Sequence, residues 1–313
     1  MNRIMSMCQQ TYWRQLLTVP DEYKYERQIT HIKNYEFETF NAESYWQNNG
    51  PGTVQRVVMT LPKNISGKTP AVVIPFYYPE AMVGFDLDTL EEEPLYRHIA
   101  MSRLLSERGF ITITGEAYYL TMLQEDKSPR DEFQRWKRSS SALLKKYPQW
   151  SGCGKLVADT QLLIDMLEND PRADHDRIGI AGHSLGGKVA FYTGCIDKRI
   201  KAILANDFGM NWDQSNWHED WYWGSKIEKF IAEGIDHSQL LTLGGGKPFM
   251  LLAGKADDQA SLDTILRSNV YEENSDKLGF INHASGHNPP VEVLEKGLDF
   301  LAKHLHISNK AIS

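Results

Sequence analysis

The chain has 313 residues, of which 41% are hydrophobic and 24% are charged, and it is long enough to bury a sizeable core. It carries 34 Lys and Arg residues against 41 Asp and Glu residues, and the net charge of −7 argues against binding to nucleic acid or anionic lipid, which need a basic surface. No apolar run has the length of a secretory signal or a membrane helix, and three widely spaced cysteines do not suit a disulfide framework (Cys8, Cys153, Cys195). We therefore expect a cytoplasmic protein that does not enter a membrane.

The first 50 residues contain few continuous apolar runs, so we expect an N-terminal arm or extra helices packed on the rest of the chain. From residue 51 to residue 313, apolar strands alternate with amphipathic helices in one domain. Strands are expected at 53–61, 71–76, 110–114, 177–181, 200–204, 249–253 and 277–281. Helices are expected at 95–108, at about 155–168, from Leu185, at about 259–270 and after Pro290. The alternation predicts an α/β fold with a mostly parallel sheet between two layers of helices.

Residues 206–246 interrupt this alternation as a long insertion between two expected strands. A connection longer than about 15 residues in a compact domain is usually functional or disordered. Disorder is disfavoured because the insertion is rich in tryptophan, with Trp212, Trp217, Trp221 and Trp223. We therefore expect an ordered, lid-like segment over the domain.

Residues 182–186 read Gly-His-Ser-Leu-Gly, which matches the pattern G-x-S-x-G. The pattern lies between an expected strand and an expected helix, where the chain must turn sharply. Glycines on both sides of the serine remove Cβ atoms that would clash in such a turn, and the turn exposes the serine hydroxyl. Ser184 is therefore the candidate nucleophile.

A serine hydroxyl becomes a good nucleophile only when a base takes its proton. His287 lies in the loop between the last expected strand and the closing helix, and it is the candidate base. His283 in the same loop is the alternative. The neighbouring His183 is expected to have a structural role, because its side chain should point away from the serine.

The base in turn needs a carboxylate that holds its imidazole in the correct tautomer. The expected strand at 249–253 is followed by two carboxylates, of which Asp257 is the candidate acid and Asp258 the alternative. Asp207, after the strand expected at 200–204, is a third candidate. A set of Ser184, Asp257 and His287 has the chain order Ser, Asp, His.

An acyl-transfer site also needs hydrogen-bond donors for the oxyanion of its tetrahedral intermediate. One donor is expected to be the backbone N–H of Leu185, directly after the serine. The second is expected in the loop after the strand at 71–76, where we favour the N–H of Tyr77.

These motifs resemble the α/β-hydrolases, and among them the dienelactone-hydrolase-like and acetyl-xylan-esterase-like branch. The resemblance covers roughly residues 50–306 and rests on the sequences around Ser184, Asp257 and His287. It implies a serine hydrolase of carboxylic esters with no metal or organic cofactor and a small-molecule ester as substrate. Dienelactone hydrolases have cysteine as nucleophile, so the serine favours esterase chemistry.

The resemblance is weakest in the Trp-rich insertion, and substrate choice is expected to lie there. Trp212, Trp217 and Trp221 are our candidates for a substrate pocket, since aromatic faces suit a ring-bearing alcohol such as an acetylated sugar. Two alternatives remain open: a serine peptidase acting on short peptides, and a ligand-binding protein that keeps the fold without catalysis.

Overall fold

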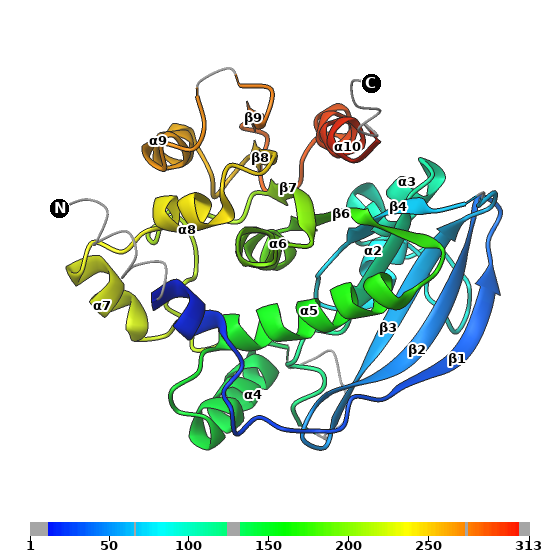
Figure 1. The fold of residues 1–313 in the computed structure, drawn as a ribbon, viewed down its shortest axis with the longest axis horizontal. Helices are drawn as coiled ribbons and strands as arrows, with labels where there is room; N and C mark the ends of the chain where they lie inside the picture. The colour runs from blue at the N-terminus through cyan, green and yellow to red at the C-terminus, as the bar shows by residue number, and fades with distance from the viewer. Residues whose placement is uncertain (1–11, 66, 124–131, 273–274, 307–313) are drawn as a thin grey trace.

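The computed structural model describes residues 12–65, 67–123, 132–272 and 275–306. In this part of the chain, nine strands form one sheet in the order β1-β2-β3-β5-β4-β6-β7-β8-β9 (Figure 1). The pairs β1–β2, β2–β3 and β3–β5 are antiparallel, and all later pairs are parallel. The strands are β1 (Ile29–Glu36), β2 (Phe40–Gly50), β3 (Thr53–Pro62), β4 (Thr69–Val73), β5 (Ile111–Gly115), β6 (Ala173–His183), β7 (Ile200–Asn206), β8 (Phe249–Ala253) and β9 (Leu278–Asn282).

Helices cover both faces of the sheet, which confirms the predicted α/β architecture (Figure 1). Side chains alternate between the faces along each strand: Ala71 and Val73 join the core under α5 and α6, whereas Val72 joins the core under α3 and α10. The helices are α2 (Pro79–Val83), α3 (Met101–Glu107), α4 (Glu132–Lys146), α5 (Gly152–Asn169), α6 (Leu185–Ile196), α7 (Lys226–Ala232), α8 (His237–Gly244), α9 (Gln259–Arg267) and α10 (Val291–His306), with a 3-10 turn η1 at Arg97–Ile99.

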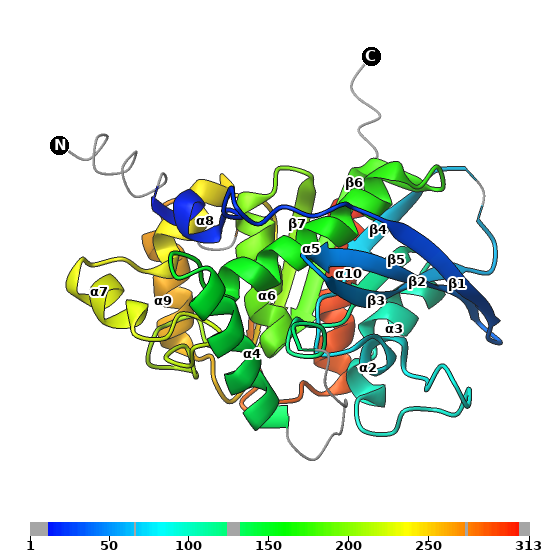
Figure 2. The same cartoon turned by 90° about the horizontal axis from the view of Figure 1, so that it is seen from below.

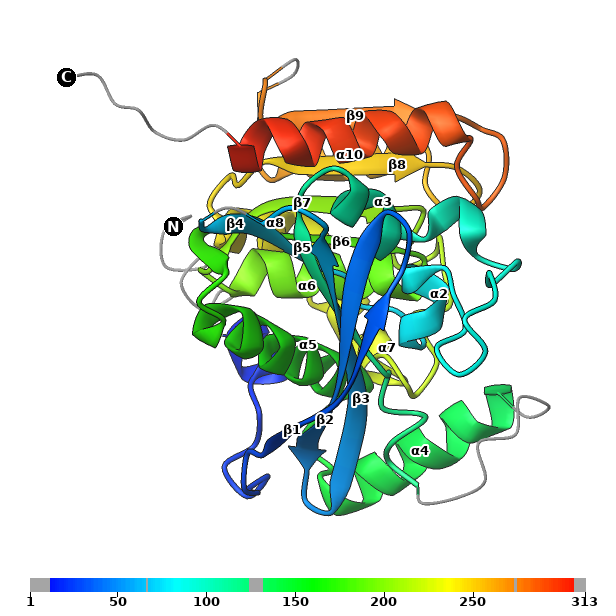
Figure 3. The same ribbon diagram turned by 90° about the vertical axis from the view of Figure 1, so that its right-hand side faces the viewer.

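The N-terminal region matches the expected extra helices only in part: residues 12–17 are helical, with Trp13 and Leu17 buried in the core, but two strands follow. Strands β1 and β2 form a hairpin that extends the sheet beyond β3, as Figure 3 shows. The pattern of apolar residues did not predict these strands, because β1 is exposed along most of its length and β2 buries polar side chains. Gln47 is one of them, and its Oε1 accepts a hydrogen bond of 2.6 Å from Gln55 Nε2 on β3.

The Trp-rich insertion is ordered and contains α7 and α8. Beside it lies α4, which carries a short run of basic residues at 135–138 (Figure 2). In the structure Arg135 and Trp136 of α4 are buried, and the Trp136 ring lies 6.0 Å from the ring of Trp221 in the insertion. Among the described residues, no helix combines the length and the apolar character that crossing a bilayer requires. Cys153 and Cys195 are buried free thiols, whereas Cys8 lies outside the described residues.

Candidate active site

Ser184 occupies the sharp turn between β6, which ends at His183, and α6, which begins at Leu185. Its backbone has φ 56° and ψ −116°, a strained conformation for a residue with a side chain. A Cβ at position 182 would collide with the carbonyl oxygen of Gly186, and a Cβ at position 186 would collide with that of Pro75. The two flanking glycines therefore permit this turn, as the G-x-S-x-G pattern predicted.

The turn places Ser184 beside the end of β7. The amide of Ser184 donates a hydrogen bond of 2.9 Å to the carbonyl oxygen of Asn206, the last residue of β7. Strands β6 and β7 are parallel and pair His183 with Asn206, so Ser184 and Asp207 leave the sheet as neighbours at its carboxyl edge. The serine is partly exposed there, as a nucleophile must be.

His287 contacts this same edge of the sheet. Its Nδ1 lies 2.5 Å from Oδ2 of Asp207, and because a carboxylate accepts, Nδ1 carries the hydrogen. Its ring centroid lies 4.5 Å from that of His183, the residue before the serine. The imidazole is thus held at the same edge of the sheet as Ser184, with its Nδ1 engaged by Asp207.

His183 itself supports the base without adding charge. Burial, and to a smaller extent the neighbouring His287, lowers the pKa of His183 to about 3, so its ring is neutral at pH 7. Its Nδ1 accepts a hydrogen bond of 2.8 Å from Nδ2 of Asn206. The neutral ring fits the structural role expected from the sequence.

Asp207 is fully buried, and backbone amides surround its carboxylate. Oδ1 accepts hydrogen bonds from the amides of Gly254, Ala256 and Asp257 at 2.9, 2.8 and 3.1 Å. Burial raises the pKa of this carboxyl, but hydrogen bonds from His287 and the backbone amides outweigh it, and the pKa is lowered to about 2. Asp207 is therefore ionised at neutral pH and able to stabilise an imidazolium.

The carboxylate on His287 is thus Asp207 and not Asp257, which the sequence analysis favoured. Asp257 is 1% exposed, and its four acceptor contacts are three backbone amides and a hydroxyl (Phe208, Gly209, Met210, Ser261). Strands β7 and β8 end side by side and each is followed by an aspartate, so Asp207 and Asp257 both fit the chain order Ser, Asp, His. The position of Asp207 directly after β7, beside the elbow, is the signal that distinguishes it.

Asp258 and His283 have hydrogen-bond partners other than His287. Asp258 caps the N-terminus of α9, where its side chain accepts a hydrogen bond of 2.9 Å from the amide of Ala260. His283 Nδ1 lies 2.6 Å from the Ser285 hydroxyl within its own loop. His287 is accordingly the histidine that the structure pairs with a buried carboxylate at the elbow.

The loop Pro75–Tyr77 lies directly against the elbow, which fits the expected place of the oxyanion donors. Leu185 is the first residue of α6, where backbone N–H groups have no partner within the helix. We expected the backbone N–H of Tyr77 as the second donor. Burial raises the pKa of the Tyr77 hydroxyl to about 12, and an interaction with the Ser184 side chain opposes this rise. The side chain of Tyr77 therefore faces the nucleophile.

A cavity of about 310 Å³ opens beside Tyr77, between α4 and the insertion. Six further residues line it: Glu132, Phe133 and Trp136 from α4, and Asn216, Trp221 and Tyr222 from the insertion. The wall from α4 was missed in the sequence analysis. The available signal was Trp136 itself, a large aromatic residue within an otherwise basic run.

Of the three predicted pocket tryptophans, Trp221 lines this cavity, whereas Trp212 and Trp217 do not. Trp217 has no exposed surface, and its Nε1 donates a hydrogen bond of 2.8 Å to the carbonyl oxygen of Gly209. Trp212 Nε1 donates to the carbonyl oxygen of Ile235 at 2.8 Å. Both indoles hold the insertion together, because their apolar area is large and each N–H needs a buried acceptor.

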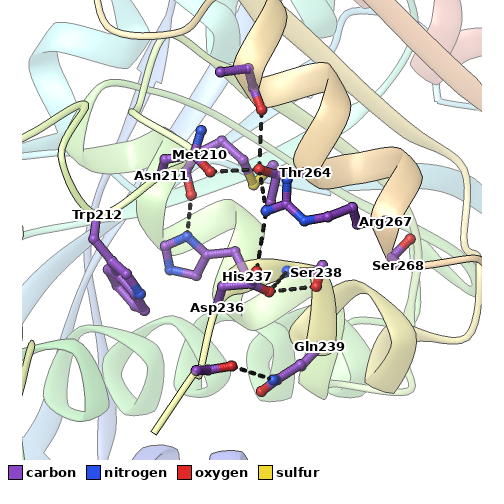
Figure 4. Close-up of polar contacts among 12 residues, drawn as sticks. Met210, Asn211, Trp212, Asp236, His237, Ser238, Gln239, Thr264, Arg267 and Ser268 are labelled. Carbon is purple, nitrogen blue, oxygen red and sulfur yellow. Dashed lines mark hydrogen bonds and ion pairs between the residues drawn. The ribbon is translucent and has the colours of Figure 1, made fainter. Parts of the chain in front are cut away.

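Trp212 instead borders a second cavity, of about 320 Å³, which includes His237 and Arg267 (Figure 4). His237 Nδ1 donates to the carbonyl oxygen of Met210, and Arg267 Nη2 lies 3.2 Å from Oδ2 of Asp236. Its walls come from the insertion and α9, so this cavity is separate from the nucleophile elbow.

The sequence matches none of the protein-family models and none of the curated proteins. The structure is similar to a glucuronoyl esterase from Solibacter usitatus, with 13% identity, a TM-score of 0.69, and coverage of 96% of this chain and 91% of that one. It is also similar to a glucuronoyl esterase of carbohydrate esterase family 15 from Teredinibacter turnerae, with 16% identity, a TM-score of 0.67, and coverage of 94% and 82%.

A third similar structure is acetyl xylan esterase 1 from Thermoanaerobacterium, with 15% identity, a TM-score of 0.57, and coverage of 94% of this chain and 93% of that one. At these identities the similarity establishes the fold, and function depends on the residues of the site. The chain has the α/β-hydrolase fold of these esterases.

Proposed function

We propose that the protein is a serine hydrolase of carboxylic esters, with Ser184 as nucleophile, His287 as base and Asp207 as the acid that orients the base. The observation that carries this proposal is the hydrogen bond between His287 and the buried Asp207 beside a strained serine turn. Folding alone does not require a partly exposed serine to adopt a strained backbone conformation. Such strain costs free energy of folding, and it is typical of functional sites.

In the proposed reaction, Nε2 of His287 takes the proton of Ser184 while Oγ attacks the ester carbonyl. The buried carboxylate of Asp207 stabilises the imidazolium that forms. The N–H of Leu185 and a group of Tyr77 donate hydrogen bonds to the oxyanion. The protonated imidazole then gives its proton to the departing alcohol, and water releases the acid from Ser184 in the reverse sequence.

We assign the cavity beside Tyr77 to the ring-bearing part of the substrate. Its aromatic walls suit the apolar face of a sugar ring, and Asn216 and Glu132 offer hydrogen-bonding groups for hydroxyls. The volume of about 310 Å³ is at the small end of ligand pockets, which fits a single ring with a short acyl group. The similar proteins that act on acetyl xylan and glucuronoyl esters support a carbohydrate ester as substrate.

The test is covalent labelling with a fluorophosphonate, followed by turnover of small esters. Stoichiometric labelling at Ser184, lost in Ser184→Ala, and hydrolysis of p-nitrophenyl acetate and acetylated xylose are expected. A folded protein that resists labelling is not a serine hydrolase, and turnover of aminoacyl anilides without ester hydrolysis would identify a peptidase.

A further inference from the structure

Two aspartates at the carboxyl edge of the sheet exchange hydrogen bonds with each other's loops. Asp207, after β7, accepts the amides of three residues in the loop 254–257 after β8. Asp257, in that loop, accepts the amides of Phe208, Gly209 and Met210 at 2.8, 2.9 and 2.6 Å. Each carboxylate therefore fixes the backbone that carries the other.

From this arrangement we infer that Asp257 is a positioning residue, which sets the direction of the Asp207 carboxylate toward His287. The inference rests on the proposed esterase function. Asp257 does not touch the base; it acts through the three residues that directly follow Asp207.

The backbone at Asp207 needs such support because it is strained. Its φ is 43°, in the left-handed region that a residue with a side chain rarely adopts. The segment that follows is held from both sides: its amides by Asp257, and the carbonyl oxygen of Phe208 by Nζ of Lys188 at 2.8 Å. Strain of this kind persists only where the surrounding contacts over-determine it.

The contacts of Asp257 require an acceptor at both oxygens. Oδ2 accepts the amides of Phe208 and Gly209, and Oδ1 accepts the amide of Met210 and the hydroxyl of Ser261. Asp257→Asn replaces one oxygen with an NH₂ group, which faces at least one N–H donor in either orientation. The segment after Asp207 must then move, and a displacement of about 1 Å at a catalytic group can cost about 10²-fold in rate.

The experiment compares the wild-type protein, Asp257→Asn and the neighbouring control Asp258→Asn. For Asp257→Asn we expect kcat for p-nitrophenyl acetate to fall about 10²-fold with little change in KM. The rising limb of kcat/KM against pH should move to lower pH, because the imidazolium loses part of its carboxylate partner. Asp258→Asn should match the wild type, since asparagine is also a good N-cap.

A second measurement reads the positioning itself. The Nδ1 proton of His287, which is shared with Asp207, should give a low-field proton NMR resonance that is weakened or shifted in Asp257→Asn. If that variant does not fold, Ser261→Ala carries the test, because it removes one donor to Asp257 and should shift the same resonance.

The outcomes separate the inference from the proposed function. Wild-type kcat, pH profile and resonance in a folded Asp257→Asn variant overturn the positioning role while leaving the esterase intact. Absence of labelling and turnover in the wild type overturns the esterase, and the NMR comparison still decides whether Asp257 positions Asp207.

Discussion

Replacing Asp207 with asparagine tests the proposed acid most directly. The structure fixes the orientation of the new amide, because the position of Oδ1 accepts hydrogen bonds from three backbone amides. The amide oxygen must take that place, and the NH₂ group then faces Nδ1 of His287. Nδ1 must become an acceptor, so the ring hydrogen moves to Nε2.

The wrong tautomer removes the base, because an Nε2 that carries a hydrogen cannot take the proton of Ser184. In Ser-His-Asp triads this substitution lowers kcat about 10⁴-fold, which corresponds to about 5.5 kcal/mol of transition-state stabilisation. We expect a loss of this size in kcat for p-nitrophenyl acetate, with a KM close to that of the wild type.

The assay is steady-state hydrolysis together with the rate of fluorophosphonate labelling, which reports the reactivity of Ser184 without turnover. Circular dichroism and thermal unfolding establish that the variant is folded. Asp258→Asn makes the same chemical change at a carboxylate that caps α9, and it should keep wild-type activity. Asp207→Asn with more than a tenth of the wild-type kcat would refute the assignment of this carboxylate.

Three further predictions follow from the same geometry. Tyr77→Phe should lower kcat about 10²-fold if the hydroxyl beside Ser184 stabilises the oxyanion, and an unchanged kcat leaves that role to the backbone N–H. Trp136→Ala should raise KM for acetylated xylose more than for p-nitrophenyl acetate, because it removes a wall of the cavity; equal changes for both esters contradict the assignment of that cavity to the sugar. The pKa of Asp207 is lowered from 3.8 to about 2, so this carboxylate contributes about 2 kcal/mol of stability above pH 4 that is lost as the pH falls to 2. Urea unfolding across this range should show a smaller acid-dependent loss in Asp207→Asn, and an identical loss would contradict the lowered pKa.

Most of the parallel part of the sheet was predictable because strands β4, β5, β7 and β8 are almost entirely buried and therefore read as continuous apolar runs. The seven strands expected from residue 53 onward are all present, and so is the turn at Ser184, whose glycines are required by local sterics. Strands β1 and β2 were not predictable in this way, because one face of the hairpin is exposed and the buried face includes amides such as Gln47. The burial of the Gln47 side chain depends on its hydrogen-bond partner Gln55, and this partner is known only once the pairing of β2 with β3 is known.

The cavity beside Tyr77 was predicted only in part, because its walls come from segments far apart in the sequence. Trp221 was expected to face a ligand, and it does line the cavity. Trp217 is a tryptophan of the same insertion, but its side chain is fully buried. A tryptophan in an insertion packs wherever its large apolar area and its N–H find partners. Residue type alone therefore does not separate a tryptophan that binds a ligand from one that holds the insertion together.

The sequence did not show which of Asp207 and Asp257 contacts His287, and the reason is a different one. Both follow a parallel strand, both are buried, and each accepts three backbone amides from the other's loop. The two carboxylates thus have similar amide partners and differ in the remaining one: Asp257 accepts the hydroxyl of Ser261, whereas Asp207 accepts the hydrogen bond from His287. That contact depends on how far the loop after β9 reaches across the edge of the sheet, which no local pattern specifies. Each aspartate accepts amides from the loop that carries the other, so we expect that losing either carboxylate disturbs the position of the other.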